Sequence, residues 1–142
     1  MDKMIRFFLC VCVTLSISVY ASAQSEMSSE PPIDQKISAC KTENPTTLGL
    51  IECDLQGYQE WTTEMERLYD ILMRQLTPAE QENLKEQQIA WLKMRDLQLE
   101  FNNRFYEGRG HTGLLMISSS KTDFSRKRAL DFQTYLDILN MK

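Results

Sequence analysis

The stretch LQGYQEWTTEMERLYDILMRQLTPAE (residues 55–80) decides the fold, because it holds one long amphipathic helix and the start of another. Its apolar residues recur at spacings of three and four, which places them on one helical face: Leu55, Tyr58, Trp61, Met65, Leu68, Tyr69, Leu72 and Leu76. The segment Thr77-Pro78-Ala79-Glu80 then predicts a new helix start. Thr77 can cap the helix, proline suits the first helical position, and Glu80 can return a hydrogen bond to the capping nitrogen.

The helix that opens at Thr77 is expected to be long. Its apolar positions run from Leu84 through Trp91 and Leu99 to Phe105, and Gly108 is a natural stop. A helix of about 30 residues would measure about 45 Å. That length exceeds what a compact domain of this size would bury, so we expect a kink or an overhanging end.

Residues 107–121 break the helical pattern with Gly108, Gly110, Gly113 and three consecutive serines. We interpret this segment as a loop of about 15 residues, long for a compact domain unless it has a function. A last helix is expected from near Thr122. No stretch alternates in the manner of a strand. The sequence therefore predicts an all-α fold: a small bundle of three main helices, one disulfide near its N-terminal end and a long loop between the last two helices. Whether a short additional helix lies near the cysteines is left open.

The first residues have the three parts of a secretory signal. Lys3 and Arg6 precede an apolar run over residues 7–20, and Ala21-Ser22-Ala23 offers small residues for cleavage. The run is shorter than the roughly 20 residues that a membrane-spanning helix needs, although an uncleaved anchor is the alternative. We predict a signal peptide over residues 1–23, a disordered lead-in over 24–32 and a folded domain over 33–142. The mature protein would be periplasmic or secreted, with no membrane span.

The charge balance excludes some classes of partner. The chain has 16 basic and 20 acidic side chains, and removal of residues 1–23 takes two basic and one acidic residue, which leaves a net charge of −5. Nucleic-acid and anionic-membrane binders need a basic excess, so neither partner is expected.

The mature chain keeps two cysteines, Cys40 and Cys53. An even pair in an exported protein predicts one disulfide. Two free thiols or a metal site are the alternatives, but a metal site needs further ligands and His111 is the only histidine. We expect neither a metal nor another cofactor.

The segment Leu84-x3-Gln88-x2-Trp91-Leu92-x2-Arg95-Asp96 resembles the signature of the lysozyme-inhibitor LprI-like family, small exported helical proteins of bacteria. The resemblance covers roughly residues 40–139. It includes two cysteines ahead of the first long helix, a tyrosine on that helix at Tyr69 and an arginine of the last helix at Arg128. The sequence departs from the family where relatives often have a further cysteine pair after the Arg-Asp motif. The resemblance implies an exported inhibitor of lysozyme-like enzymes.

Four residues of this motif, Leu84, Gln88, Trp91 and Arg95, are spaced 4, 3 and 4 and so form one stripe on their helix. One interpretation is a recognition stripe, because tryptophan and arginine often anchor interfaces. The other, which we favour, is structural. Trp91 would then be core, Gln88 and Arg95 would bond neighbouring helices, and Asp96 would pair with an arginine such as Arg128.

The glycine-containing loop is the candidate partner-binding segment, through Arg109, His111, Leu114 and Leu115. Cationic donors and an apolar tip on a flexible backbone could enter the cleft of a partner enzyme. The same composition also describes a mobile connector, and both interpretations stay open.

No catalytic constellation stands out. Two carboxylate pairs have helical spacing, Asp96 with Glu100 and Glu64 with Asp70, but such pairs are also common on ordinary solvated helix faces. The sequence contains no nucleophile turn of the G-x-S-x-G kind. We expect no enzymatic activity. The sequence favours an exported binding protein whose partner is a lysozyme-like muramidase. The alternative is an envelope interaction or immunity protein with another partner, and the oligomeric state is left open.

Overall fold

The computed structural model describes residues 30–141. The described helices belong to one compact unit, residues 32–142. The expected signal peptide over residues 1–23 and residues 24–29 of the lead-in lie outside the described residues. None of the described helices is long and apolar enough to cross a membrane.

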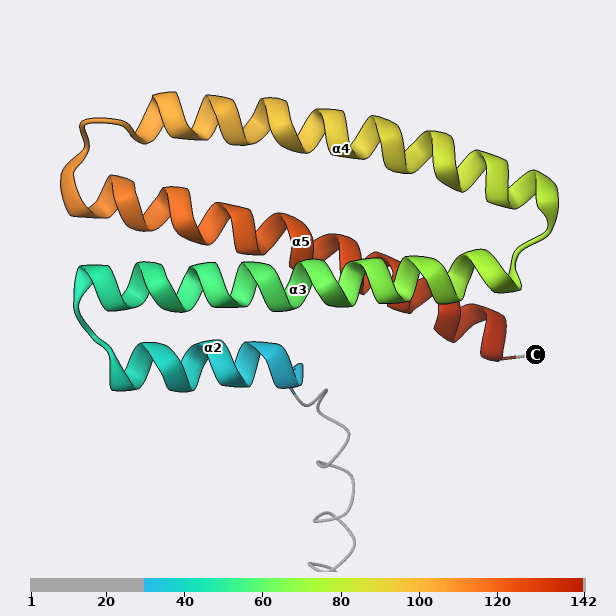
Figure 1. Cartoon of the computed structure of the whole chain (residues 1–142), viewed down its shortest axis with the longest axis horizontal. Coiled ribbons are helices and arrows are strands. Elements are labelled where there is room, and N and C mark those ends of the chain that lie inside the picture. Colours follow the sequence, from blue (N-terminus) through green and yellow to red (C-terminus); the bar gives the residue numbers. More distant parts are fainter. Residues whose placement is uncertain (1–29, 142) are drawn as a thin grey trace, which may run out of the picture. The chain divides into compact units, whose positions relative to one another are not determined.

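The described unit contains four helices: α2 (Pro32–Glu43), α3 (Thr47–Gln75), α4 (Pro78–Tyr106) and α5 (Gly110–Asn140). The all-α prediction is confirmed, but the count of three main helices is wrong. Figure 1 shows α2 beside the first half of α3, α5 crossing α3, and α4 on the far side of α5. The most extensive packing is between α3 and α5, and α2 packs on α3 while α4 packs on α5.

The additional helix, α2, is held to the bundle by a disulfide and by a partly buried polar contact. Cys40 and Cys53 form the predicted disulfide, which joins α2 to α3 with their Cα atoms 5.8 Å apart. Nearer the start of α2, the Asp34 carboxylate accepts hydrogen bonds from Trp61 Nε1 at 3.0 Å and from Arg126 Nε at 2.7 Å. Asp34 therefore ties α2 to both α3 and α5.

The core lies between α3 and α5. Its buried residues are Trp61, Met65, Leu68 and Leu72 of α3, Leu84 of α4, and Ala129, Phe132 and Leu136 of α5. Burial of apolar side chains of this size is the main stabilising contribution in such a bundle. Leu55 belongs to the predicted apolar face of α3 but is exposed, because the buried stripe at this end of the helix runs through Cys53 and Gly57 instead.

A second polar group fixes the end of the unit that carries the disulfide. Asp54 of α3 is only 3% exposed, and its carboxylate lies 2.6 Å from Lys41 Nζ of α2. Ser118 Oγ of α5 donates to the same carboxylate at 2.7 Å, and Thr122 Oγ1 donates to the Asp54 carbonyl at 2.7 Å. A buried charge is tolerated only when it is paired in this manner.

Helix α4 begins where the sequence predicts. The Thr77 backbone nitrogen donates to Glu80 Oε2 at 2.9 Å and the Glu80 nitrogen donates to Thr77 Oγ1 at 3.4 Å, which is the reciprocal capping box. Along the whole helix, which is fully described, Leu84 is the one buried residue. The expected length of about 30 residues is confirmed by the 29 residues of α4, but α3 and α5 are similarly long at 29 and 31 residues, so the length of α4 does not require a kink or an overhanging end.

The long loop expected over residues 107–121 is wrong, because α5 begins at Gly110 and only Glu107–Arg109 connect it to α4. Gly108 and Gly110 have φ angles of 74° and 63°, a region open to glycine at low cost, and together they make a tight turn. The serines do not break the helix because their hydroxyls donate to carbonyls three residues back, as Ser118 does to Leu115 at 3.0 Å. Contacts with Asp54 then add to the stability of this part of α5.

Candidate partner-binding site

Arg128 of α5 is the centre of the contact between α4 and α5. Its side chain is 3% exposed. Its Nε donates to Gln88 Oε1 at 2.9 Å and its Nη2 donates to Gln87 Oε1 at 2.6 Å. Burial lowers the pKa of Arg128 from its ordinary value, while the nearby Asp131 carboxylate acts in the opposite direction. The two glutamines therefore solvate a guanidinium group that water does not reach.

Trp91 lies between two arginines in the same region. The guanidinium carbon of Arg95 is 5.4 Å from the centroid of the Trp91 ring, and that of Arg128 is 5.5 Å away. Trp91 is half-buried and packs against the core. Asp96 pairs with its neighbour Arg95 at 2.7 Å, so the expected pairing of Asp96 with Arg128 is wrong. Gln88 and Trp91 of the motif therefore attach α4 to α5 through an amide contact and a ring contact. Arg95 bonds Asp96 of its own helix, so the expectation that Arg95 bonds a neighbouring helix is wrong.

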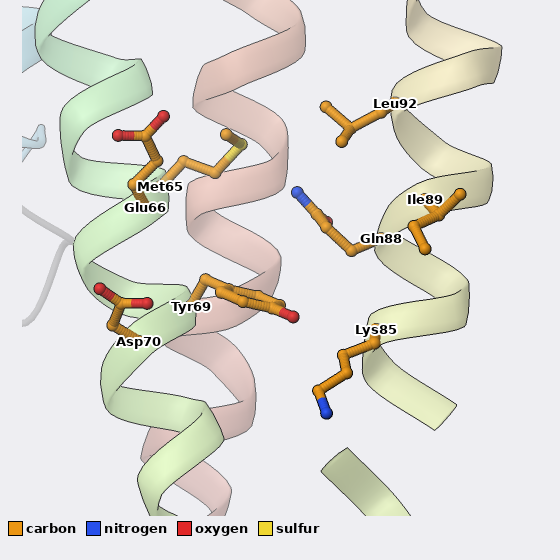
Figure 2. A pocket seen from close by; sticks show the side chains of 8 residues that line it. All are labelled: Met65, Glu66, Tyr69, Asp70, Lys85, Gln88, Ile89 and Leu92. Carbon is orange, nitrogen blue, oxygen red and sulfur yellow. The ribbon is translucent and has the colours of Figure 1, made fainter. Parts of the chain in front are cut away.

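A cleft of about 420 Å³ opens beside this contact. It forms because α4 packs on α5 but has little contact with α3. Figure 2 shows the side chains of α3 and α4 on its two sides, with α5 behind them. Its lining is Met65, Glu66, Tyr69 and Asp70 of α3 and Lys85, Gln88, Ile89 and Leu92 of α4. The lining mixes carboxylates, an ammonium group and apolar side chains, so its chemistry does not select one class of ligand.

Three of the four carboxylates considered in the sequence, those of Glu64, Asp96 and Glu100, form ion pairs with arginines of their own helices. Glu100 lies 2.6 Å from Arg104, and Glu64 lies 2.7 Å from Arg67. Among residues 30–141, no group of three or more histidine, cysteine, aspartate or glutamate side chains is placed to hold a metal ion.

The end of the unit that contains the turn between α4 and α5 presents a different surface. Figure 1 places the start of α3, the end of α4 and the start of α5 together at this end. We define the tip as five of its exposed residues, Leu48, Phe105, Arg109, His111 and Leu114; Glu107 of the turn is exposed as well. Three of the four residues singled out in the sequence, Arg109, His111 and Leu114, belong to the tip, whereas Leu115 is half-buried.

Two side chains of the tip, those of Arg109 and His111, are held in place by contacts with neighbouring residues. The Arg109 guanidinium carbon lies 4.3 Å from the centroid of the Phe105 ring, and Arg109 Nε donates to the Phe105 carbonyl at 2.6 Å. His111 Nδ1 lies 3.1 Å from Thr47 Oγ1, which joins the start of α5 to the start of α3. The Nη groups of Arg109 and Nε2 of His111 bond to no described residue.

Phe105 was not singled out in the sequence as part of the candidate site. The signal was present, because Phe105 and Arg109 are four residues apart and side chains at that spacing meet on a helix. Leu48 had no such signal, since its position beside the turn depends on how α3 packs on α5. The resulting surface combines an aromatic ring, two leucines and cationic donors, the residue types that anchor protein interfaces.

Comparison with known proteins gives one finding. The family model described as Lysozyme inhibitor LprI matches residues 38–132, a range that includes the disulfide, the motif on α4, the turn between α4 and α5 and Arg128. No curated protein and no solved structure matches the chain significantly.

Proposed function

Because the chain belongs to the lysozyme inhibitor LprI family, whose model covers more than half of its length, we propose that it is an exported inhibitor of lysozyme-like muramidases. The family match is the observation that carries the proposal. The proposal includes a signal peptide over residues 1–23, a lead-in over 24–32, a working domain over 33–142 and a periplasmic or secreted location. It assigns the protein a binding role with no enzymatic activity of its own.

We place the contact with the enzyme at the tip. Glycoside hydrolases of the lysozyme type act through paired carboxylates in a cleft. Arg109 offers guanidinium N–H groups with no partner among the described residues, and a bidentate arginine–carboxylate pair is one of the strong charge-assisted contacts. Phe105 holds the guanidinium group against its ring and adds apolar area around it. The tip projects from one end of the unit, as a group that enters a cleft must.

The charge of the rest of the molecule supports the same partner. Without residues 1–23 the chain has a net charge of −5, by the charge balance given above. An acidic protein attracts a basic enzyme over distances comparable to the Debye length and so raises the association rate. The guanidinium group of Arg109 in the tip would then act at short range only, within the enzyme cleft.

The test is a lysis assay in which the turbidity of a bacterial cell-wall suspension is followed after muramidase is added. We expect the exported protein to slow lysis in proportion to its concentration. The double variant Phe105→Ala/Arg109→Ala should raise the concentration for half-inhibition at least about tenfold, since loss of an interface anchor costs about 1–2 kcal/mol. Ile138→Ala is the matched control, because Ile138 is exposed near the opposite end of α5 and its variant should inhibit as the wild type does.

The two parts of the proposal fail separately. Undiminished lysis in the presence of a large excess of folded wild-type protein contradicts the inhibitor function. Inhibition by the wild type that the double variant retains in full contradicts the tip as its site.

A further inference from the structure

The outer face of α4 carries an apolar stripe that the bundle does not use. Ala90, Met94, Leu97 and Phe101 are spaced 4, 3 and 4, and all four are exposed. We call these residues the α4 stripe. They line a shallow hollow of about 410 Å³ together with Lys93 and Gln98. No described residue of another helix lines this hollow, and the spacing is that of the seam of a two-stranded coiled coil.

We propose that the α4 stripe binds the α4 stripe of a second copy of this chain, with the two helices antiparallel about a two-fold axis. In this register Met94 meets Leu97 of the second copy, and Leu97 meets its Met94. Phe101 meets Ala90 of the second copy, so the largest side chain of the stripe faces the smallest one. Two such contacts by symmetry fill the hollows at both ends of the stripe. A two-fold contact of this kind is self-complementary, as a closed dimer requires.

The charged residues beside the stripe select the same partner and the same direction. Lys93 and Glu100 are seven residues apart and occupy the same edge of the stripe. In the antiparallel register Lys93 lies beside Glu100 of the second copy, and Glu100 lies beside its Lys93. A parallel pair would instead place Lys93 against Gln98, without a charge of opposite sign. Lys93 and Glu100 thus meet across the interface only when the two helices run in opposite directions.

Both partners of this contact are available. Lys93 has no hydrogen bond or ion pair within the described residues. Glu100 pairs with Arg104 on the same helix at 2.6 Å, in a surface contact where both side chains are more than half exposed. A surface pair of this kind contributes little and can rearrange. The ion pairs would therefore fix the register, while the apolar layers would provide the stability.

The proposal does not depend on the muramidase function. The two-fold axis falls between residues 95 and 96, about 14 Å along the helix from Phe105. The antiparallel arrangement directs the two tips to opposite ends of the dimer, so both stay accessible. The four residues that each stripe contributes make a small interface, and we expect the dimer to have a dissociation constant on the order of 10 µM.

The test is sedimentation equilibrium of the protein after export with its own N-terminal segment, over concentrations from about 1 to 500 µM. We expect the wild type to pass from monomer to dimer in this range. Leu97→Asp should stay monomeric throughout. Ile138→Asp is the control, because Ile138 and Leu97 are similarly exposed at 55% and 58%, and its variant should dimerise as the wild type does. Circular dichroism confirms that each variant is folded.

Charge reversal tests the register. Lys93→Glu alone and Glu100→Lys alone should each weaken the dimer about tenfold or more, because like charges then meet twice across the axis. The double variant Lys93→Glu/Glu100→Lys should recover the wild-type dissociation constant within about threefold. A wild type that is monomeric at the highest concentration overturns the proposal, as does a dimer that Leu97→Asp leaves intact. Failure of the double variant to recover overturns the antiparallel register.

Discussion

Substitution of Gln88 by leucine tests the contact that attaches α4 to the bundle. The change removes the acceptor of Arg128 Nε, now satisfied at 2.9 Å, and leaves a charged donor without a partner at a position that is 3% exposed. Hydrogen bonds to charged groups contribute about 1.5–3 kcal/mol, and a buried donor left unpaired loses its hydration as well. We expect the free energy of unfolding to fall by about 2 kcal/mol.

A double-mutant cycle with Arg128→Met separates the contact from the rest of the site. Arg128→Met alone removes both hydrogen bonds and the contact with the Phe132 ring at 4.3 Å, but it also removes a buried charge. These effects oppose each other, and we expect the free energy of unfolding to fall by about 1.5 kcal/mol. The double variant no longer has an unpaired guanidinium group and should lose about 2 kcal/mol in total, so the coupling energy is about 1.5 kcal/mol.

The assay is urea unfolding followed by far-ultraviolet circular dichroism, with the disulfide intact and the protein dilute. Gln59→Leu serves as control, since Gln59 is exposed on α3, and its variant should stay within about 0.5 kcal/mol of the wild type. Additive losses in the cycle, or a neutral Gln88→Leu variant, would refute the view that Arg128 depends on Gln88.

Three further predictions concern stability and use the same unfolding assay. Replacement of both Cys40 and Cys53 by serine should lower the free energy of unfolding by about 3 kcal/mol, because the disulfide closes a loop of 13 residues. A decrease of less than about 1 kcal/mol would contradict this. Gly57→Ala should lower the free energy of unfolding by about 1–3 kcal/mol, since the new Cβ would lie 2.7 Å from Ile37 Cγ1 where α2 crosses α3. An unchanged urea midpoint would contradict this and show that α2 can move away freely. Asp54→Ala should lower the free energy of unfolding by about 3 kcal/mol, because it leaves Lys41 and Ser118 without their shared carboxylate. Asp70→Ala, at an exposed position of the same helix, is its control and should be nearly neutral.

The sequence was sufficient for features that depend on neighbouring residues. The capping box at Thr77 is local, and it lies where it was predicted. The face of α3 that includes Trp61, Met65 and Leu72 follows from helical period, and these residues are buried. The disulfide follows from the even count of cysteines outside the expected signal peptide.

The start of α5 could not be predicted from composition. Glycine lowers helix propensity by about 1 kcal/mol, so Gly110 and Gly113 favour a loop when they are considered alone. Gly113 is buried, however, and a Cβ there would clash with the backbone carbonyl oxygen of Tyr106, so the turn requires a residue without a side chain. Ser118 and Thr122 then bond Asp54, which is more than 60 residues earlier in the sequence. Such long-range contacts override local propensity.

The candidate site was predicted in part for the same reason. Arg109 and His111 lie at or next to an exposed turn, as a glycine-containing segment indicates. The partner of Arg109, Phe105, is close in the sequence, whereas the partner of His111, Thr47, lies on α3, 64 residues earlier. The role of Arg128 was only partly anticipated. The sequence suggested Asp96 as its partner, whereas the register of α4 on α5 brings Gln87 and Gln88 to it instead.

The most direct test of the central claim is a calorimetric titration of a lysozyme-like muramidase with the exported, disulfide-bonded protein. The inhibitor function predicts saturable binding with one enzyme molecule for each tip, and binding that Arg109→Glu weakens at least about tenfold, since it would place a carboxylate against the carboxylates of the enzyme cleft. Absence of binding by the folded wild type would contradict the claim that this member of the family acts on muramidases.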